Sequence, residues 1–362
     1  MSYVPMINAT KPILTNLEDR VCNMIRLFGK ISISLILSFL LFSTIYPEDL
    51  IKIGMVGLDT SHVIAFAEIF NKPENPKYIP GFRIIVGYPG GSPDVEASYT
   101  RVEKFTERLR EEFGVEIVNS IEEVCQRVDA ILLTSVDGRV HLEQVKVIFK
   151  AKKPVFIDKP LAGSLKDALM IEMLGNKYGV PWFSSSAYRF YTTLKRLKDV
   201  DIGTIHTVIS YGPCHIEPHH PDLFWYGIHP TEALFAVMGV GCETVTRTHT
   251  PDTDVVTGVW KDGKVGVLVG LRKGELPHQV IAFGEKGTAK QDSGGDDYVE
   301  LAKEIANFFK TRVPPVSPQE TIEIFAFMES AEESKKLGGV PVKITEVLER
   351  AKSEISPNND NL

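Results

Sequence analysis

The chain has 362 residues, of which 43% are hydrophobic and 9% aromatic, and its 40 Lys and Arg stand against 47 Asp and Glu, a formal net charge of −7. This length predicts two domains of about 150 residues each, and the mixed composition excludes a disordered, collagen-like or multi-span membrane protein. The acidic balance argues against nucleic acid as a partner, because nucleic-acid affinity comes largely from Lys and Arg that neutralise phosphates.

Residues 31–46 form an uncharged, largely apolar run (ISISLILSFLLFSTIY) that follows Arg26 and Lys30. A spanning helix needs about 20 apolar residues and a signal-peptide core about 7 to 15, so the length favours an export signal within a leader of residues 1–48. Met24 is a possible true start, because MIRLFGK supplies the positive segment directly. The alternative is an uncleaved anchor. The sequence therefore predicts a protein that is exported (periplasmic or extracellular) or anchored to the membrane by residues 31–46.

Strand and helix patterns alternate through residues 49–186. We expect strands at 51–56, 82–86, 116–118, 130–134, 155–157 and 182–185, and helices at 63–70, 101–113, 121–127, 141–151 and 165–178. Strands that are separated by helices pair in parallel through right-handed crossovers. These residues therefore predict an α/β Rossmann-like domain with a doubly wound parallel sheet, suited to nucleotide binding.

The pattern becomes β-rich in residues 187–345. Alternating or β-branched runs predict strands at 204–210, 243–248, 255–260, 265–271 and 279–283, with a hairpin turn at 261–264. Helices are expected at 298–310 and 321–336, with Gly338 and Gly339 past the end of the second. The sequence predicts an α+β domain with a mostly antiparallel open sheet, followed by a tail at 346–362.

The turn after the first strand reads GLDTSH from Gly57 to His62. A dinucleotide fingerprint would place glycines at 57, 59 and 62, and only Gly57 is present. Asp59 would bring a carboxylate to the pyrophosphate position, and His62 would bring bulk to a place of close helix packing. Asp59, Thr60 and Ser61 are N-cap residues, and free backbone N–H groups there can hold an anion. A nucleotide-binding turn and a capped turn that binds no nucleotide both remain open.

The strand at 155–157 runs into Asp158-Lys159-Pro160. Together with the strand that ends at Thr134, the His141 helix and Gly227-Ile228-His229, it resembles the Gfo/Idh/MocA oxidoreductases over roughly residues 50–344. The resemblance implies a nucleotide domain, then an α+β domain whose open sheet often forms the oligomer interface of a homo-oligomer. It also implies an NAD or NADP cofactor and no metal. The cofactor residues are then Gly57, Asp59, Thr60, Ser61, His62, Thr134, Asp158 and Lys159.

Lys159 matches the lysine of the family's Glu-Lys-Pro motif, in which the shorter Asp158 replaces Glu. The resemblance implies that Lys159 hydrogen bonds the reacting hydroxyl group and tunes proton transfer beside the nicotinamide. A lysine at a strand end inside a cleft can have its pKa lowered by desolvation, which suits this role. The alternative is a solvated lysine in a turn.

The second domain contains WYGIHPTE, from Trp225 to Glu232, where the family has Asp-x-Gly-x-His-x-x-Asp. His229 matches the family's histidine and Glu232 can replace the last acid, whereas Trp225 replaces the first Asp. The resemblance implies that His229 assists proton transfer, for which a histidine is suited near pH 7. A hydrogen-bonded core histidine is the alternative.

Histidines are concentrated just before this motif. His215, Glu217 and His219 would alternate along a strand and point three side chains to one side, so a divalent metal site is a minor alternative to no metal. A sugar-binding wall is the preferred interpretation. Its residues would be His220, Trp225, Tyr226 and Glu232.

The leading hypothesis is an NAD(P)-dependent oxidoreductase that acts on a sugar, cyclitol or glycoside by hydride transfer, with Lys159 and His229 assisting proton transfer. One alternative is a cofactor-cycling or metal-assisted sugar lyase or glycosidase-like enzyme. Another is a non-catalytic carbohydrate-binding homologue. Because the fingerprint is degraded at 59 and 62, we expect weak binding of exchangeable NAD(P), or retention of the cofactor by other contacts.

Overall fold

The computed structural model describes Met1 and residues 50–293, 295 and 298–355. The predicted export or anchor segment at residues 31–46 lies outside these residues. Among the described residues, no helix has both the length and the apolar content required to cross a membrane.

The first domain is built on a six-stranded parallel sheet in the order β3-β2-β1-β4-β5-β6. β1 lies between β2 and β4, so the strand order reverses there, and ligands of open α/β sheets bind outside the carboxyl ends of strands at such a point. The predicted doubly wound, Rossmann-like sheet is confirmed. Its strands are β1 (Ile51–Val56), β2 (Phe82–Tyr88), β3 (Glu116–Ile117), β4 (Ala130–Leu133), β5 (Val155–Ile157) and β6 (Trp182–Ser184).

Helices cover both faces of this sheet, which explains why β4 and β5 are continuous buried apolar runs. One buried cluster joins Val56 and Leu133 to Val145 of α6, and another joins Met55 and Leu132 to Phe66 of α2. The helices are α2 (His62–Asn71), the short α3 (Glu96–Tyr99), α4 (Val102–Phe113), α5 (Ile121–Arg127), α6 (His141–Lys150) and α7 (Leu165–Tyr178).

The second domain contains a seven-stranded sheet in the order β12-β11-β7-β10-β9-β8-β13. Its pairs are antiparallel except for β7 with β10, so the mostly antiparallel sheet is also confirmed. The predicted hairpin between β9 and β10 closes through a hydrogen bond from Trp260 N to Lys264 O. The strands are β7 (Ile205–Pro213), β8 (Cys242–His249), β9 (Thr253–Trp260), β10 (Val265–Leu271), β11 (Gln279–Gly284), β12 (Gly287–Lys290) and β13 (Val342–Lys343).

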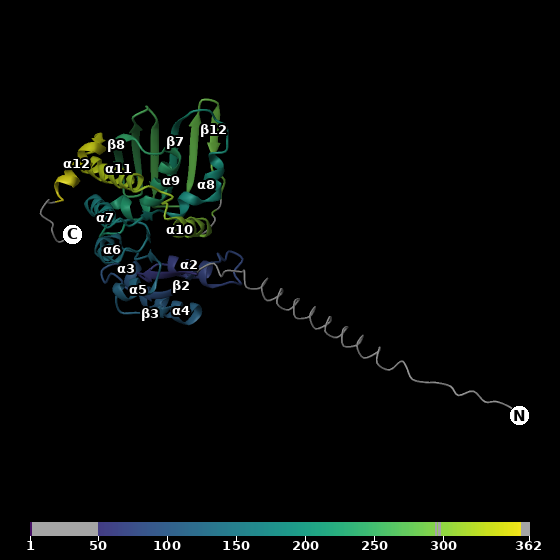
Figure 1. Ribbon diagram of the computed structural model, residues 1–362. Helices are drawn as coiled ribbons and strands as arrows, with labels where there is room; N and C mark the ends of the chain where they lie inside the picture. The colour runs from purple at the N-terminus through teal and green to yellow at the C-terminus, as the bar shows by residue number, and fades with distance from the viewer. Residues whose placement is uncertain (2–49, 294, 296–297, 356–362) are drawn as a thin grey trace. The chain divides into compact units, whose positions relative to one another are not determined.

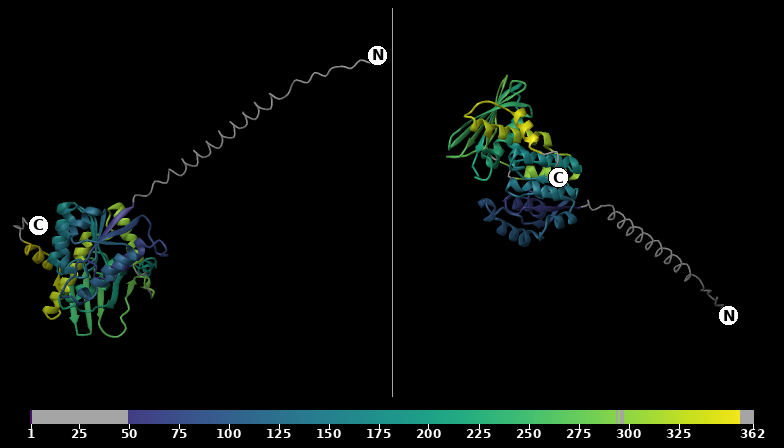
Figure 2. Two further views of the ribbon diagram at one scale, coloured as in Figure 1. Left: turned by 90° about the horizontal axis from the view of Figure 1, so that it is seen from below. Right: turned by 90° about the vertical axis from the view of Figure 1, so that its left-hand side faces the viewer.

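Helices α9 (Ile228–Met238) and α11 (Pro318–Lys336) pack against one face of the second sheet (Figure 1). The sequence interpretation did not include α9. α11 begins three residues earlier than predicted, because Ser317 caps it by accepting a hydrogen bond from Glu320 N at 3.1 Å. The two sheets, one in purple and blue and the other in green, lie at opposite ends of this body (Figure 2). The remaining helices are α8 (Thr192–Leu197), α10 (Val299–Thr311) and α12 (Ile344–Ser353).

Helix α10 follows the second sheet in the chain but packs into the core of the first domain. Leu301, Ile305 and Phe308 of α10 are buried in the same cluster as Phe156 and Phe183 of the first sheet. The Phe183 and Phe308 rings lie 5.0 Å apart, edge to face. The chain therefore crosses between the domains again after the second sheet, and the two domains share apolar packing.

Candidate functional site

A cavity of about 320 Å³ lies where the carboxyl edge of the first sheet meets the second domain. Its walls come from the turn after β1, the loop after β5, the segment after β6, and the π-helical turn Leu223–Gly227 with the start of α9. Lys159 and His229, which are far apart in sequence, line this one cavity. A larger hollow of about 640 Å³ on α5 and α6 contains none of the predicted site residues.

Lys159 stands just past the end of β5 and is half-buried. Its backbone N–H donates to Asp158 Oδ1 at 2.8 Å, and its Nζ lies 5.7 Å from the centre of the Tyr226 ring. Burial lowers the pKa of Lys159, and the neighbouring Asp158 carboxylate only partly opposes this shift. Lys159 therefore gives up its proton more readily than a lysine in water.

His62 and Asp158 form a buried pair beside Lys159. The Nδ1 atom of His62 is hydrogen bonded to Asp158 Oδ2, and the His62 ring lies 4.5 Å from the Tyr298 ring. Burial alone would raise the pKa of Asp158, but His62 and Lys159 outweigh it and hold that pKa below its usual value. Asp158 is therefore a carboxylate at neutral pH and fixes the orientation of His62.

His229 faces the same cavity from the first turn of α9. Its Nδ1 is hydrogen bonded to Ser186 Oγ at 2.7 Å. Burial, then the charges of Lys159, His278 and His62, hold the pKa of His229 well below its usual value. The imidazole is therefore neutral at pH 7 and can accept a proton.

The four residues predicted to form a sugar-binding wall are divided by the structure. Trp225 and Tyr226 line the cavity, with Tyr226 5.4 Å from His229 between ring centres. Glu232 is buried behind the wall, where Ser185 Oγ and Arg189 Nη1 lie 3.3 and 3.1 Å from Oε2. Burial raises the pKa of Glu232 to about 7, against the opposing effect of Arg189. His220 does not line the cavity either.

The turn after β1, which begins at Gly57, is tight, and the side chain of Asp59 points into the protein interior. Gly57 has a φ of +82°, and a Cβ there would lie 2.2 Å from Ser135 Oγ, so the turn requires glycine. The prediction that Asp59 brings its carboxylate to the pyrophosphate position is wrong: Asp59 is fully buried and accepts hydrogen bonds from Val136 N at 2.9 Å and Ser98 Oγ at 2.6 Å. Thr134 is also buried, and its hydroxyl donates to Gly57 O at 2.7 Å.

This turn fits a dinucleotide in spite of the two missing glycines. Thr60, Ser61 and His62 line the cavity at the N-terminus of α2, where backbone N–H groups have no intrahelical acceptor and attract an anion. Ser61 is the N-cap residue but its side chain makes no capping hydrogen bond. Because the Asp59 carboxylate is withdrawn and the His62 ring is held by Asp158, neither obstructs an NAD(P) pyrophosphate at this helix end.

The histidine-rich segment is not a strand, so the predicted alternation of His215, Glu217 and His219 is wrong. β7 ends at Pro213 and residues 214–220 form a loop. Glu217 accepts from Nδ1 of both His219 and His220, at 2.8 and 2.9 Å, while the exposed His215 ring lies 5.1 Å from the Tyr226 ring. No group of metal-ligating side chains is present among the described residues.

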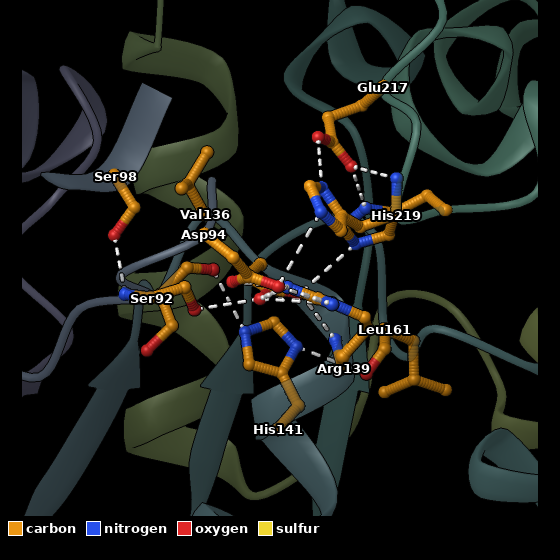
Figure 3. A network of polar contacts seen from close by, with 12 residues as sticks. Ser92, Asp94, Ser98, Val136, Arg139, His141, Leu161, Glu217 and His219 are labelled. Atoms are coloured by element: carbon orange, nitrogen blue, oxygen red, sulfur yellow. Dashed lines mark hydrogen bonds and ion pairs between the residues drawn. The ribbon is translucent and has the colours of Figure 1, made fainter. Parts of the chain in front are cut away.

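Instead, ion pairs and hydrogen bonds connect this loop to the first domain (Figure 3). His220 Nε2 lies 3.1 Å from Asp137 Oδ1. Asp137 also accepts from Ser92 Oγ at 2.7 Å and pairs with Arg139, which in turn pairs with Asp94. We call Asp94, Asp137, Arg139, Glu217, His219 and His220 the interdomain clasp. It holds the loop before Trp225 against the turn after β4.

Sequence reasoning missed several cavity residues. Ser186, which orients His229, lies at the carboxyl edge of the sheet after β6, so the position of β6 gave a signal for it. The sequence contained no signal that Arg101 lines the cavity, since this residue precedes a charged helix of ordinary pattern. His278 and Tyr298 come from segments of the second half that reach the cavity only in the folded chain.

Comparisons with known proteins agree with this architecture. Residues 51–205 match the oxidoreductase family with an NAD-binding Rossmann fold, Gfo/Idh/MocA. The chain is 27% identical over 203 residues to the uncharacterised oxidoreductase YrbE of Bacillus subtilis, and 28% identical over 208 residues to myo-inositol 2-dehydrogenase of Thermotoga maritima. These matches span 48% and 49% of this chain but only 58% and 60% of those two proteins.

The fold is similar to that of a solved scyllo-inositol dehydrogenase from Lactobacillus casei with bound NAD(H) and scyllo-inositol. The TM-score is 0.67 at 15% sequence identity, over 82% of this chain and 99% of that one. Fold and site together define a protein with a Rossmann-like first domain and a second, mostly antiparallel sheet domain, and a cavity where the two meet. Residues 51–205 of the chain are similar to the Gfo/Idh/MocA family of oxidoreductases.

Proposed function

We propose that this protein is an NAD(P)-dependent oxidoreductase that oxidises a hydroxyl group of a sugar, cyclitol or glycoside. The observation that carries the proposal is the meeting of Lys159 and His229, from different domains, in one cavity at the carboxyl edge of the Rossmann sheet. Burial lowers the pKa of Lys159 towards neutrality, which suits proton transfer, and burial lowers the pKa of His229 so that its ring is unprotonated at pH 7. Residues 51–205 match a family that binds NAD, which supports the cofactor.

The reaction removes a hydride from carbon and a proton from oxygen, leaving a carbonyl group. NAD(P)+, when bound, supplies the hydride acceptor. His229 is neutral and held through Nδ1 by Ser186, which leaves its other ring nitrogen to take the hydroxyl proton. Lys159 donates a hydrogen bond to the same oxygen and stabilises the negative charge that develops there. Trp225 and Tyr226 supply flat walls for a sugar ring.

Titration of the purified protein with NADH and NADPH, followed by nicotinamide fluorescence, tests cofactor binding. The withdrawn Asp59 and the position of the N-terminus of α2 at the cavity lead us to expect saturable binding, weaker than that of a turn with all its glycines. A screen of sugars, cyclitols and glycosides for NAD(P)+ reduction then tests the activity. Protein that binds neither dinucleotide and reduces neither with any substrate would contradict the proposal.

A second candidate is a lyase in which the cofactor is reduced and reoxidised within each turnover. The His62–Asp158 pair favours it, because elimination needs another acid–base group in the cavity beyond Lys159 and His229. The two candidates differ in one readout. An oxidoreductase accumulates NAD(P)H in step with product, whereas the lyase forms product from a glycoside with no net change in NAD(P)H.

We also propose a homo-oligomer that forms through the face of the second sheet opposite α9 and α11. Val255 and Val259 of β9 are exposed there, and Val267 and Val269 of β10 are only half-buried. Apolar β-branched side chains on one face of a sheet suit burial against a second copy. Light scattering of wild type and Val259→Glu tests this, with a smaller particle expected for the variant. Equal masses would contradict it.

For localisation, we propose export or membrane anchoring by the segment at residues 31–46, which rests on the sequence alone. A removed leader would give a mature protein that begins between about Ser43 and Leu50 outside the cytoplasm. Mass spectrometry of the N-terminus in fractionated cells of the native host tests this. An intact N-terminus in membranes would favour the anchor, and one in the cytoplasm would contradict both.

A further inference from the structure

The walls of the cavity carry positive charge, although the chain as a whole has a net charge of −7. Arg101 and Lys159 line it and supply this charge, whereas the rings of His229 and His278, whose pKa values burial lowers, line it as neutral groups at pH 7. Among the described residues, no aspartate or glutamate lines the cavity. Asp158, the nearest carboxylate to Lys159 in the chain, lies behind the wall and is already bonded to His62. The cavity therefore attracts anions.

Arg101 is placed to bind such an anion. It lies at the N-terminal flank of α4 and is half-buried. Its Nε atom donates to Ala97 O, which fixes the plane of the guanidinium group. No carboxylate of the described residues forms an ion pair with Arg101, in contrast to Arg139, which pairs with both Asp94 and Asp137. Its two terminal nitrogens therefore remain available as a pair of parallel N–H donors, and this geometry allows a bidentate contact with a carboxylate.

Arg101 also lies near the reacting end of the cavity. Its charge contributes to the lowered pKa of Lys159, after the larger effect of burial. Ala97, to which it is bonded, lines the cavity with Trp225 and Tyr226. A ligand group held by Arg101 would therefore belong to a molecule that also contacts Lys159.

From this arrangement, and on the basis of the function proposed above, we propose that the substrate is a sugar acid whose carboxylate is bound by Arg101 while a hydroxyl group lies at Lys159 and His229. A neutral sugar would leave the half-buried Arg101 without a charged partner, at a cost in desolvation. A cofactor phosphate is the other source of an anion. The N-terminus of α2, formed by Thr60, Ser61 and His62, already provides for the pyrophosphate.

Calorimetric titration tests the proposal without requiring turnover. The probes are D-glucuronate, D-galacturonate and D-gluconate, each compared with its uncharged sugar or amide, in the presence of saturating NADH and again without it. We expect at least one acid to bind about 10-fold or more tightly than its uncharged counterpart, as a charge-assisted bidentate contact gives. Arg101→Gln should abolish this preference, and Arg101→Lys should retain part of it. Arg110→Gln, exposed on the same helix, is the matched control and should retain all of it.

Two outcomes would overturn the proposal. In one, no acid binds more tightly than its neutral counterpart to the wild-type protein. In the other, Arg101→Gln leaves acid binding unchanged and weakens binding of NADH or NADPH, which would assign Arg101 to a cofactor phosphate. A failure of the proposed function looks different, since acids would then bind with the Arg101 preference while no substrate reduces NAD(P)+.

Discussion

The imidazole of His62 is hydrogen bonded to the carboxylate of Asp158, although the two residues are 96 positions apart. His62 lies where a dinucleotide fingerprint has glycine, and Asp158 lies where the Glu-Lys-Pro motif of the similar oxidoreductases has glutamate. The two differences are complementary in the structure: the ring of His62 occupies space beside Asp158, which is shorter than glutamate, and the Asp158 carboxylate holds the ring by a hydrogen bond. The larger side chain is thus accommodated at the start of α2, and an additional acid–base pair borders the cavity.

Replacing the two proton-transfer residues should reduce activity and leave the fold intact. Lys159→Ala and His229→Ala should each lower turnover by about 10²-fold or more, because each removes positioning or proton transfer in the reaction. The melting temperature should change little, since neither side chain belongs to a buried apolar cluster. Lys150→Ala, on the exposed face of α6, is the control. Loss of stability before loss of turnover would assign both residues a structural role.

Asp158→Asn should change the pH dependence of the reaction. The carboxylate of Asp158 raises the pKa of Lys159 against the larger lowering effect of burial. Without it, the pKa of Lys159 falls further, so the limb of the kcat/KM profile that follows Lys159 should move to lower pH. Profiles of wild type, Asp158→Asn and the exposed control Asp199→Asn provide the measurement. An unmoved limb in Asp158→Asn would show that Lys159 does not set the profile.

Glu232→Gln should make the stability of the protein less dependent on pH. The pKa of Glu232 is raised by burial to about 7 in the folded protein, above its usual value of 4.5, so folding favours the protonated form. The contribution of Glu232 to the free energy of unfolding is therefore highest below pH 4.5 and falls as pH rises towards 7, by about 3 kcal/mol. Urea unfolding at several pH values should show this fall in wild type relative to Glu232→Gln. Parallel curves for the two proteins would contradict the assignment.

The two aspartates of the interdomain clasp should differ in their contribution to stability. Asp137 is buried, and its carboxylate contacts Ser92, Arg139 and His220. Asp137→Ala removes the buried acceptor of Ser92 Oγ and leaves Arg139 with Asp94 alone and His220 with Glu217 alone, so we expect a loss of about 3 kcal/mol. Asp94 is exposed, so Asp94→Ala should change the unfolding midpoint little. Equal losses of unfolding free energy in Asp137→Ala and Asp94→Ala would show that the burial of Asp137 does not increase its contribution to stability.

The sequence predicted the elements that bury continuous apolar runs. β1, β4 and β5 and the helices between them follow from period and turn chemistry, which are local properties. Helix α9 was missed because its start contains Pro230 and was interpreted as a family motif. α10 was placed correctly in the chain, but its packing on Phe156 and Phe183 depends on contacts that no local pattern records.

At the site, the sequence predicted residue types better than side-chain directions. Lys159 and His229 were predicted from the motifs that contain them, and both line the cavity. The inward turn of Asp59 depends on Ser98 and Val136, which are 39 and 77 positions away. The false strand at 215–219 followed from alternation alone, whereas Glu217 bonds its own neighbours His219 and His220 and closes a loop.

A crystal structure of the protein with bound NAD+ would show whether hydride transfer takes place in the cavity between the domains. We expect the pyrophosphate to lie at the N-terminus of α2 and the nicotinamide ring to enter the cavity beside Lys159 and His229. A dinucleotide bound elsewhere on the molecule, or a nicotinamide ring kept out of this cavity, would contradict this expectation.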